Sequence, residues 1–112
     1  MLAISDSQVL PETDLPVPLP VEWETTDGLT AFGFLSLPAN SLYSGQGLPP
    51  LIVNVHGGPT SQVPLSYPSD ALYFTTRGYA WLEVNYRGST GYGRKYRDSL
   101  SGRWGEADVE DC

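Results

Sequence analysis

The apolar positions of the chain fall in short runs, separated by segments rich in Pro, Gly and Ser. Val21 to Thr25 and Leu29 to Leu37 are strand-like runs on either side of Thr26-Asp27-Gly28. Asp-Gly supplies the positive φ that a tight hairpin turn needs. We therefore predict an antiparallel β-hairpin over residues 21–37, which Pro38 ends.

A strand, a helix and a second strand are predicted next. Leu51 to Val55 is mostly β-branched and lacks polar alternation, which predicts a central strand covered on both faces. Ser69 to Arg77 predicts a helix, with Ser69 capping its free amides and Gly78 in the left-handed closing conformation. Tyr79 to Tyr86 is a strand again. This order implies a right-handed crossover, and hence a parallel pair beside the antiparallel hairpin.

The remaining segments are predicted to be irregular. Residues 1–20 are proline-rich, which favours an extended, unpaired lead-in or linker before one domain over residues 21–112. Residues 39–50 read as a surface connection. Arg87 to Gly105 is rich in Gly, Ser, Tyr and Arg, which predicts an exposed excursion. A short acidic helix is predicted to begin at Glu106.

Composition excludes several kinds of partner. The 13 acidic against 6 basic residues give a net charge of −7, which argues against nucleic acid and anionic membranes. The lone Cys112 cannot form an internal disulfide, and no secretory signal is present, so we expect a cytoplasmic location. The uncharged stretch between Asp27 and Asp70 is interrupted too often for a membrane-spanning helix.

His56-Gly57-Gly58-Pro59 directly follows the apolar strand at 51–55 and is the most informative motif of the chain. In α/β-hydrolases the loop after the third strand contributes a backbone N–H to the oxyanion hole, and glycine lets that backbone approach a substrate carbonyl closely. Gly57 and Gly58 are the candidate donors. The alternative interpretation is a tight turn at the end of a strand.

The chain offers no catalytic triad. His56 is its only histidine, and in the hydrolase order Ser, then Asp or Glu, then His, a catalytic histidine comes last. We therefore expect His56 to hold the loop by a hydrogen bond. No further His, Cys or carboxylate ligands lie near His56 at the close spacing of a zinc site, so no metal or cofactor is predicted. No serine lies in Gly-x-Ser-x-Gly; Ser89 comes nearest, but Arg87 stands where the first glycine should be.

The segment after the last predicted strand allows two other interpretations. Gly88 to Lys95 superficially resembles a phosphate-binding loop, but a Walker loop needs Gly-Lys followed by Ser or Thr. The tyrosines and cations of Tyr86 to Arg103 could stack on single-stranded nucleic acid, although the overall charge argues against it. A solvated loop pinned by aromatic contacts is the interpretation we favour.

Four motifs in order resemble the prolyl oligopeptidase family of serine peptidases, with acylaminoacyl-peptidase and dipeptidyl-aminopeptidase members most similar. The resemblance spans roughly residues 20 to 112. The motifs are Pro50 to Gln62, Arg77-Gly78-Tyr79-Ala80, Asn85 to Gly93 and Gly102-Arg103-Trp104-Gly105. It implies the N-terminal portion of an α/β-hydrolase catalytic domain that cleaves short peptides through an acyl-enzyme.

The resemblance also assigns individual positions. Gly58 matches the loop position whose N–H helps to bind the oxyanion, while His56 stands where several relatives place an oxyanion-stabilising tyrosine. The family's Ser, Asp and His all lie downstream of Cys112, and its β-propeller is absent from this chain. We therefore expect these 112 residues to be catalytically incompetent by themselves.

Two alternatives to a peptidase portion stay open. One is a non-catalytic binding or assembly module that self-associates through an exposed sheet edge. The other is the front part of a lipase or esterase, which also uses a His-Gly-Gly loop, usually with a further glycine where Pro59 stands.

Overall fold

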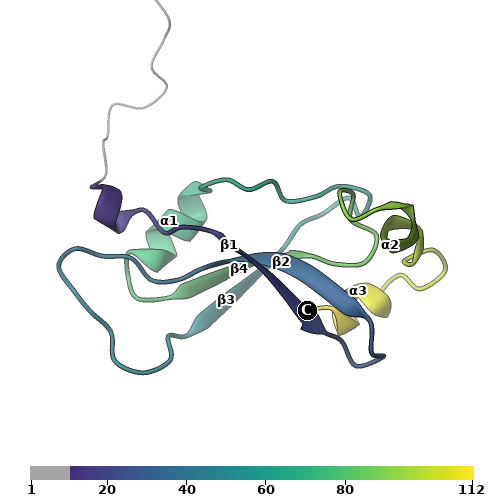
Figure 1. Cartoon of the computed structure of the whole chain (residues 1–112), viewed down its shortest axis with the longest axis horizontal. Coiled ribbons are helices and arrows are strands. Elements are labelled where there is room, and N and C mark those ends of the chain that lie inside the picture. The colour runs from purple at the N-terminus through teal and green to yellow at the C-terminus, as the bar shows by residue number, and fades with distance from the viewer. Residues whose placement is uncertain (1–10) are drawn as a thin grey trace, which may run out of the picture.

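The computed structural model describes residues 11–112, which form one mixed four-stranded sheet with short helices against it (Figure 1). The strands lie in the order β1-β2-β4-β3. The elements are η1 (Glu12–Asp14), β1 (Leu19–Glu24), β2 (Thr30–Ser36), β3 (Leu51–Val55), α1 (Ser69–Thr75), β4 (Ala80–Asn85), α2 (Arg94–Asp98) and α3 (Ala107–Glu110).

The predicted hairpin is confirmed. β1 and β2 pair in antiparallel fashion, and the turn between them contains Gly28 at φ +76°. The Thr25 N–H donates to the Leu29 carbonyl at 2.8 Å and closes the turn. The prediction of unpaired chain up to residue 20 is wrong at its end, because Leu19 and Pro20 already pair with β2. Proline is tolerated there since β1 is an edge strand. The lead-in at residues 1–10 lies outside the described residues.

The parallel β3-α1-β4 unit is also confirmed. Gly78 ends the turn after α1 at φ +91°, a conformation that costs glycine little. The predicted cap is wrong: Ser69 is already the first helical residue, the N-cap is Pro68, and no side chain caps the helix.

The prediction that residues 51–55 form a central strand is wrong for the described sheet. β4 lies between β2 and β3, so β3 is at an edge. Leu51, Val53 and Val55 remain 50, 40 and 47% exposed on one face. β4 instead has five buried residues out of six. The apolar pattern of 51–55 correctly indicates a strand, but strand order depends on pairing with the distant hairpin.

The core is built on both faces of β4. Phe74 of α1 stacks on Trp81, with ring centroids 5.6 Å apart. On the opposite face Val84 packs in a small cluster with buried Tyr86, Leu100 and Ala107. The indole N–H of Trp23 in β1 donates to the Asp111 carbonyl at 3.1 Å, which joins the hairpin to the end of the chain.

The prediction of an exposed excursion over residues 87–105 is wrong at its start and at Leu100, whereas residues 91–99 are exposed or half-buried. Arg87, Gly88 and Ser89 are buried, and Leu100 is 2% exposed. The chain folds back there because polar partners far along the sequence satisfy the buried groups, as described below. α3 begins at Ala107, one residue after the predicted start.

None of the helices in residues 11–112 has both the length and the apolar character required to cross a lipid bilayer.

Candidate functional site

The candidate site is the loop that begins at the carboxyl end of β3. His56-Gly57-Gly58-Pro59 leaves the sheet there, beside the carboxyl end of the parallel strand β4. In open α/β sheets, ligands bind at the carboxyl ends of the strands. The predicted motif therefore lies at the carboxyl end of the parallel strands, where ligands bind in sheets of this kind.

Gly57 and Gly58 lie at the surface with free amides. Both are exposed, and neither N–H donates a hydrogen bond to another residue of the described chain. Gly58 has φ +63°, a left-handed conformation that favours glycine, and a Cβ at either position would meet nothing within 4 Å. A substrate oxygen can therefore approach both amides.

His56 is held on two sides. Its ring stacks on the Tyr86 ring with centroids 4.6 Å apart and an interplanar angle of 19°. Nε2 lies 2.9 Å from the Ser89 hydroxyl, and Nδ1 lies 3.2 Å from the carbonyl of Gly57. The Tyr86 hydroxyl donates to the His56 carbonyl at 2.9 Å, and burial raises the pKa of that hydroxyl. The predicted loop-holding hydrogen bond of His56 is thus present.

Asn85 anchors the next part of the loop. It is 1% exposed, and its Oδ1 accepts from the Val63 N–H at 2.7 Å. Its Nδ2 donates to the Val63 carbonyl and to the Tyr92 hydroxyl, at 3.3 and 3.0 Å. The Thr90 N–H adds a bond to the Ser61 carbonyl at 2.8 Å. Sequence reasoning did not single out Asn85; a polar side chain at the end of an apolar strand was the available signal.

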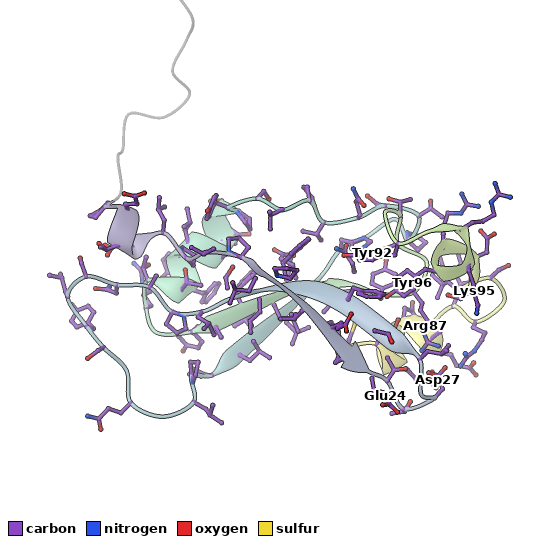
Figure 2. The ribbon with its side chains drawn as sticks, viewed as in Figure 1. Glu24, Asp27, Arg87, Tyr92, Lys95 and Tyr96 are labelled. Carbon is purple, nitrogen blue, oxygen red and sulfur yellow. The ribbon has the colours of Figure 1, made fainter. Side chains whose placement is uncertain are left out.

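Arg87 is a buried cation at the start of the segment that follows β4 (Figure 2). Its Nε donates to Asp111, which is 0% exposed, at 2.8 Å, and the Arg87 backbone N–H donates to the same carboxylate at 2.6 Å. Its Nη atoms contact Asp27 and Glu110 at 2.5 and 3.2 Å. The guanidinium therefore joins the hairpin turn to α3.

The electrostatics of this cluster favour its charged forms. Burial opposes the charge of Arg87, but the hydrogen bonds that it donates to Asp111 and Asp27 outweigh this effect and raise the pKa of Arg87. The Thr25 hydroxyl, followed by Arg87, holds the pKa of the Asp27 carboxyl well below its usual range. We assign this cluster a structural role rather than ligand binding, because each of its charged side chains is already paired with another.

Aromatic contacts pin the segment after Arg87, as predicted. Tyr92 stacks on Phe32 of β2 with centroids 4.6 Å apart, and Tyr96 meets Phe32 edge-on at 5.2 Å. The Tyr96 hydroxyl donates to the Asn85 carbonyl at 2.7 Å, and burial raises its pKa. These rings, together with Lys95, line a hollow of about 280 Å³.

Ser89 is not placed to act as a nucleophile. It is the nearest approach to an elbow serine and contacts a histidine, but it is 0% exposed. A substrate carbonyl cannot reach a hydroxyl that is fully covered. Within the described residues no group of three or more His, Cys, Asp or Glu side chains could hold a metal ion.

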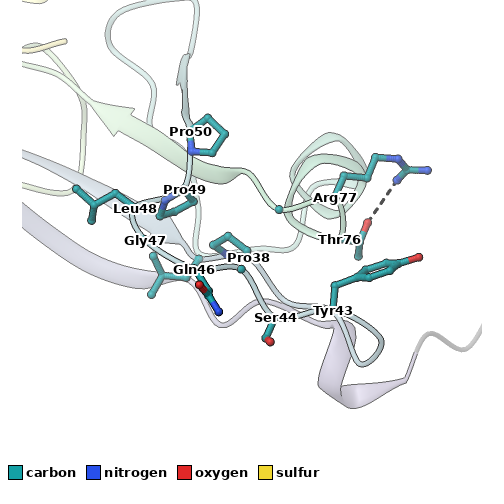
Figure 3. A pocket seen from close by; sticks show the side chains of 13 residues that line it. Pro38, Tyr43, Ser44, Gln46, Gly47, Leu48, Pro49, Pro50, Thr76 and Arg77 are labelled. Atoms are coloured by element: carbon teal, nitrogen blue, oxygen red, sulfur yellow. Dashed lines mark hydrogen bonds between the residues drawn. The ribbon is translucent and has the colours of Figure 1, made fainter.

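Another hollow is lined by residues that lie before β3 and β4 in the sequence (Figure 3). It measures about 840 Å³ and is formed by residues 43–50 with Leu37 and Pro38, which follow β2, and the turn after α1. Those segments precede β3 and β4, so the hollow lies at the amino ends of these parallel strands, opposite His56.

Comparison with known proteins identifies the family. The prolyl oligopeptidase family profile matches residues 65–112. The uncharacterized peptidase YuxL of Bacillus subtilis is 33% identical over 100 residues, covering 89% of this chain and 15% of that protein. The acylamino-acid-releasing enzyme of Arabidopsis thaliana is 48% identical over 63 residues, covering 56% of this chain and 8% of that protein.

A solved structure agrees in fold. The puromycin-hydrolyzing peptidase of Mycobacterium tuberculosis superimposes with a TM-score of 0.91 at 37% identity, over 98% of this chain and 17% of that one. The present chain thus spans about a sixth of its length, with the arrangement of the corresponding part of an α/β-hydrolase domain. The chain belongs to the prolyl oligopeptidase family of serine peptidases.

Proposed function

We propose that this chain supplies the oxyanion-hole loop of a serine peptidase that hydrolyses short peptides through an acyl-enzyme. Gly58 N–H is the proposed donor, with Gly57 N–H beside it. The observation that supports this most directly is that both amides are exposed and form no hydrogen bond within residues 11–112, at the carboxyl end of β3.

Acyl transfer explains why free amides are useful there. When a serine hydroxyl attacks a peptide carbonyl, the carbonyl oxygen becomes an oxyanion, and fixed N–H donors stabilise that charge. Glycine at both positions leaves room for the substrate. The loop therefore stabilises the transition state, whereas the attacking group and its base must come from other residues.

Residues 1–112 contain no Gly-x-Ser-x-Gly, and their only histidine is turned to Ser89. We expect the purified 112-residue chain to release no product from acyl-peptide or aminoacyl chromogenic substrates. Turnover that disappears when one of its own residues is mutated would contradict this expectation.

The donor itself is tested in the complete polypeptide, meaning the longest gene product that contains residues 1–112. Gly58→Ala places an L-residue at φ +63° and tilts the amide. We expect kcat to fall toward the roughly 10²–10³-fold loss seen when an oxyanion donor is removed. Gly47→Ala is the matched control, because it adds the same methyl group at φ +82° with nothing within 4 Å, in the loop before β3 and away from the candidate site, and its loss should be much smaller.

Equal and small effects of the two alanines would overturn the role of Gly58. Steady-state kinetics should show the loss in kcat rather than KM, because an oxyanion donor acts chiefly in the transition state.

Substrate class and location extend the same proposal. The relatives include acylamino-acid-releasing enzymes and a puromycin-hydrolyzing peptidase. We expect short peptides with a blocked or aminoacyl N-terminus, which a panel of chromogenic peptides of increasing length would test. We also expect a cytoplasmic location, which cell fractionation with an antibody to the chain would test.

A second candidate function is self-association through the edge of β3. β3 has one neighbouring strand in the described sheet, and Leu51, Val53 and Val55 are 40–50% exposed. An apolar edge strand is a template for pairing with another chain. Light scattering of the 112-residue chain should show association that rises with concentration and falls in Val53→Lys. Val109→Lys, at an exposed site on α3, should leave it unchanged.

A further inference from the structure

The Gly57–Gly58 peptide is tethered on its carbonyl side. The Gly57 carbonyl lies 3.2 Å from His56 Nδ1, and His56 Nε2 lies 2.9 Å from the buried hydroxyl of Ser89. Ser89 lies in the segment after β4, 33 residues after His56 in the sequence. The hydrogen-bonded series therefore joins the second strand of the parallel pair to the loop of the first.

The Gly57 carbonyl at the end of this series determines which group donates and which accepts in each hydrogen bond. A carbonyl oxygen can only accept, so the proton of the neutral His56 ring must lie on Nδ1 to donate to Gly57. Nε2 then has a free lone pair and accepts a hydrogen bond from the Ser89 hydroxyl. Ser89 is 0% exposed and its hydroxyl has no other hydrogen-bond partner among residues 11–112. The series runs from Ser89 through His56 to the Gly57 carbonyl.

The Gly57 carbonyl belongs to the same planar peptide unit as the Gly58 N–H. In a trans peptide the C=O and N–H bonds point in opposite directions, and no cis peptide occurs in the described chain. Fixing the carbonyl toward His56 therefore directs the Gly58 N–H away from His56. Without this tether, two adjacent glycines leave the peptide plane free to rotate.

We infer that Ser89 is a positioning residue that sets the tautomer and orientation of His56 and thereby the direction of the Gly58 N–H. This inference rests on the proposed function, since the amide so directed is the proposed oxyanion donor. It gives the serine of the Arg87-Gly88-Ser89 motif a role that does not require substrate contact. It also gives His56 a role in the oxyanion hole that is exerted through the backbone.

The test compares two variants of the complete polypeptide that each delete one buried hydroxyl. Ser89→Ala removes the donor to His56. Thr75→Val removes a hydroxyl that is also 0% exposed but bonds to the Ala71 carbonyl within α1. We expect Ser89→Ala to lower kcat about tenfold or more with little change in KM, as for an interaction made in the transition state. Thr75→Val should leave both constants near wild type.

A spectroscopic measurement separates positioning from a general loss of structure. Long-range ¹H–¹⁵N NMR of the His56 ring should show the proton on Nδ1 in wild type and a shift toward the Nε2 tautomer in Ser89→Ala. His56→Phe identifies the signal by removing it. The His56→Phe variant keeps an aromatic ring stacked on Tyr86 but loses both hydrogen bonds of His56. It should therefore lower kcat at least as much as Ser89→Ala does. If the Ser89→Ala protein does not fold, the kcat of His56→Phe still tests the inference.

The outcomes distinguish this inference from the proposed function. If Gly58→Ala lowers kcat while Ser89→Ala behaves as Thr75→Val, or if wild-type His56 has its proton on Nε2, the positioning role is wrong and the donor role stands. If Gly58→Ala leaves kcat unchanged, the proposed function itself fails. A fall in kcat for Ser89→Ala together with the tautomer shift supports the inference.

Discussion

At the scale of single residues, Arg87 shows how a charge can be accommodated in the interior of a small sheet protein. Its side chain is 1% exposed, and Asp111 beside it is 0% exposed. Removing water from two charges is costly, and a buried pair compensates only when the geometry satisfies its hydrogen bonds. Here the Asp111 carboxylate accepts from both the side chain and the backbone of Arg87.

We predict a large stability loss when this cation is removed. Arg87→Leu leaves Asp111 buried without its counter-ion, which typically costs about 3–5 kcal/mol. Arg97→Leu is the control, because Arg97 and Asp98 form a pair that is 45 and 55% exposed and such pairs contribute about 0–1 kcal/mol. Urea unfolding of the complete polypeptide measures both. Similar midpoints for the two variants would mean that the buried pair contributes little.

The same cluster makes stability depend on pH. Because the pKa of Asp27 is lower in the folded protein than its ordinary value of 3.8, the stability that it contributes is fully present above about pH 4. That contribution is lost as the pH falls further, since the unfolded chain takes up the proton first. We expect the stability difference between wild type and Asp27→Asn to be constant from pH 7 to pH 5 and to shrink below pH 4 in urea titrations. A difference that grows on acidification would contradict this sign.

At the scale of elements, the close approach of β2 and β4 depends on Gly33. Gly33 pairs with Val84, and a Cβ at Gly33 would collide with the backbone carbonyl of Glu83. Backbone atoms in the middle of a sheet cannot move aside, so a methyl group there must separate the strands.

We therefore predict that Gly33→Ala destabilises the sheet by about 1–3 kcal/mol, the usual cost of overpacking. Gly45→Ala, in a loop where a Cβ meets nothing within 4 Å, should be neutral or slightly stabilising. Hydrogen exchange of β2 and β4 amides should rise in Gly33→Ala alone. Unchanged protection would show that the strands can shift to accept the methyl group.

The elements also show what the sequence could and could not predict. The hairpin turn at Asp27-Gly28 and the strand at 80–85 follow from local patterns, and so does the His-Gly-Gly loop. The edge position of β3 does not, because it requires β4 to pair with a hairpin some 50 residues earlier. Arg87 looked like a surface residue because its partners, Asp111 and Asp27, lie 24 and 60 residues away.

At the scale of the whole molecule, the core is small. Eight apolar residues are buried among those described, and four of them are alanines: Ala31, Ala71, Ala80 and Ala107. Larger side chains such as Val53, Leu65 and Trp104 remain 40 to 64% exposed. Burial of apolar area contributes roughly 25 cal/mol per Å², so alanines add little.

We predict that the isolated 112-residue chain is partly molten or aggregates. Thermal scans followed by near-UV circular dichroism should show a broad transition, and the dye ANS should bind at neutral pH. A sharp cooperative melt in a monomeric preparation would contradict this prediction.

The ion pairs of Arg87 have a consequence for the order in which parts of the sheet can pack during synthesis. The hairpin leaves the ribosome first, but the carboxylate that neutralises Arg87 is made 24 residues after it. Until α3 has been made, the guanidinium has only Asp27 among these carboxylates and stays hydrated. The side of the sheet that α3 covers can therefore close only when position 111 has emerged, so residues of α3 and its C-cap complete an interior that the hairpin began.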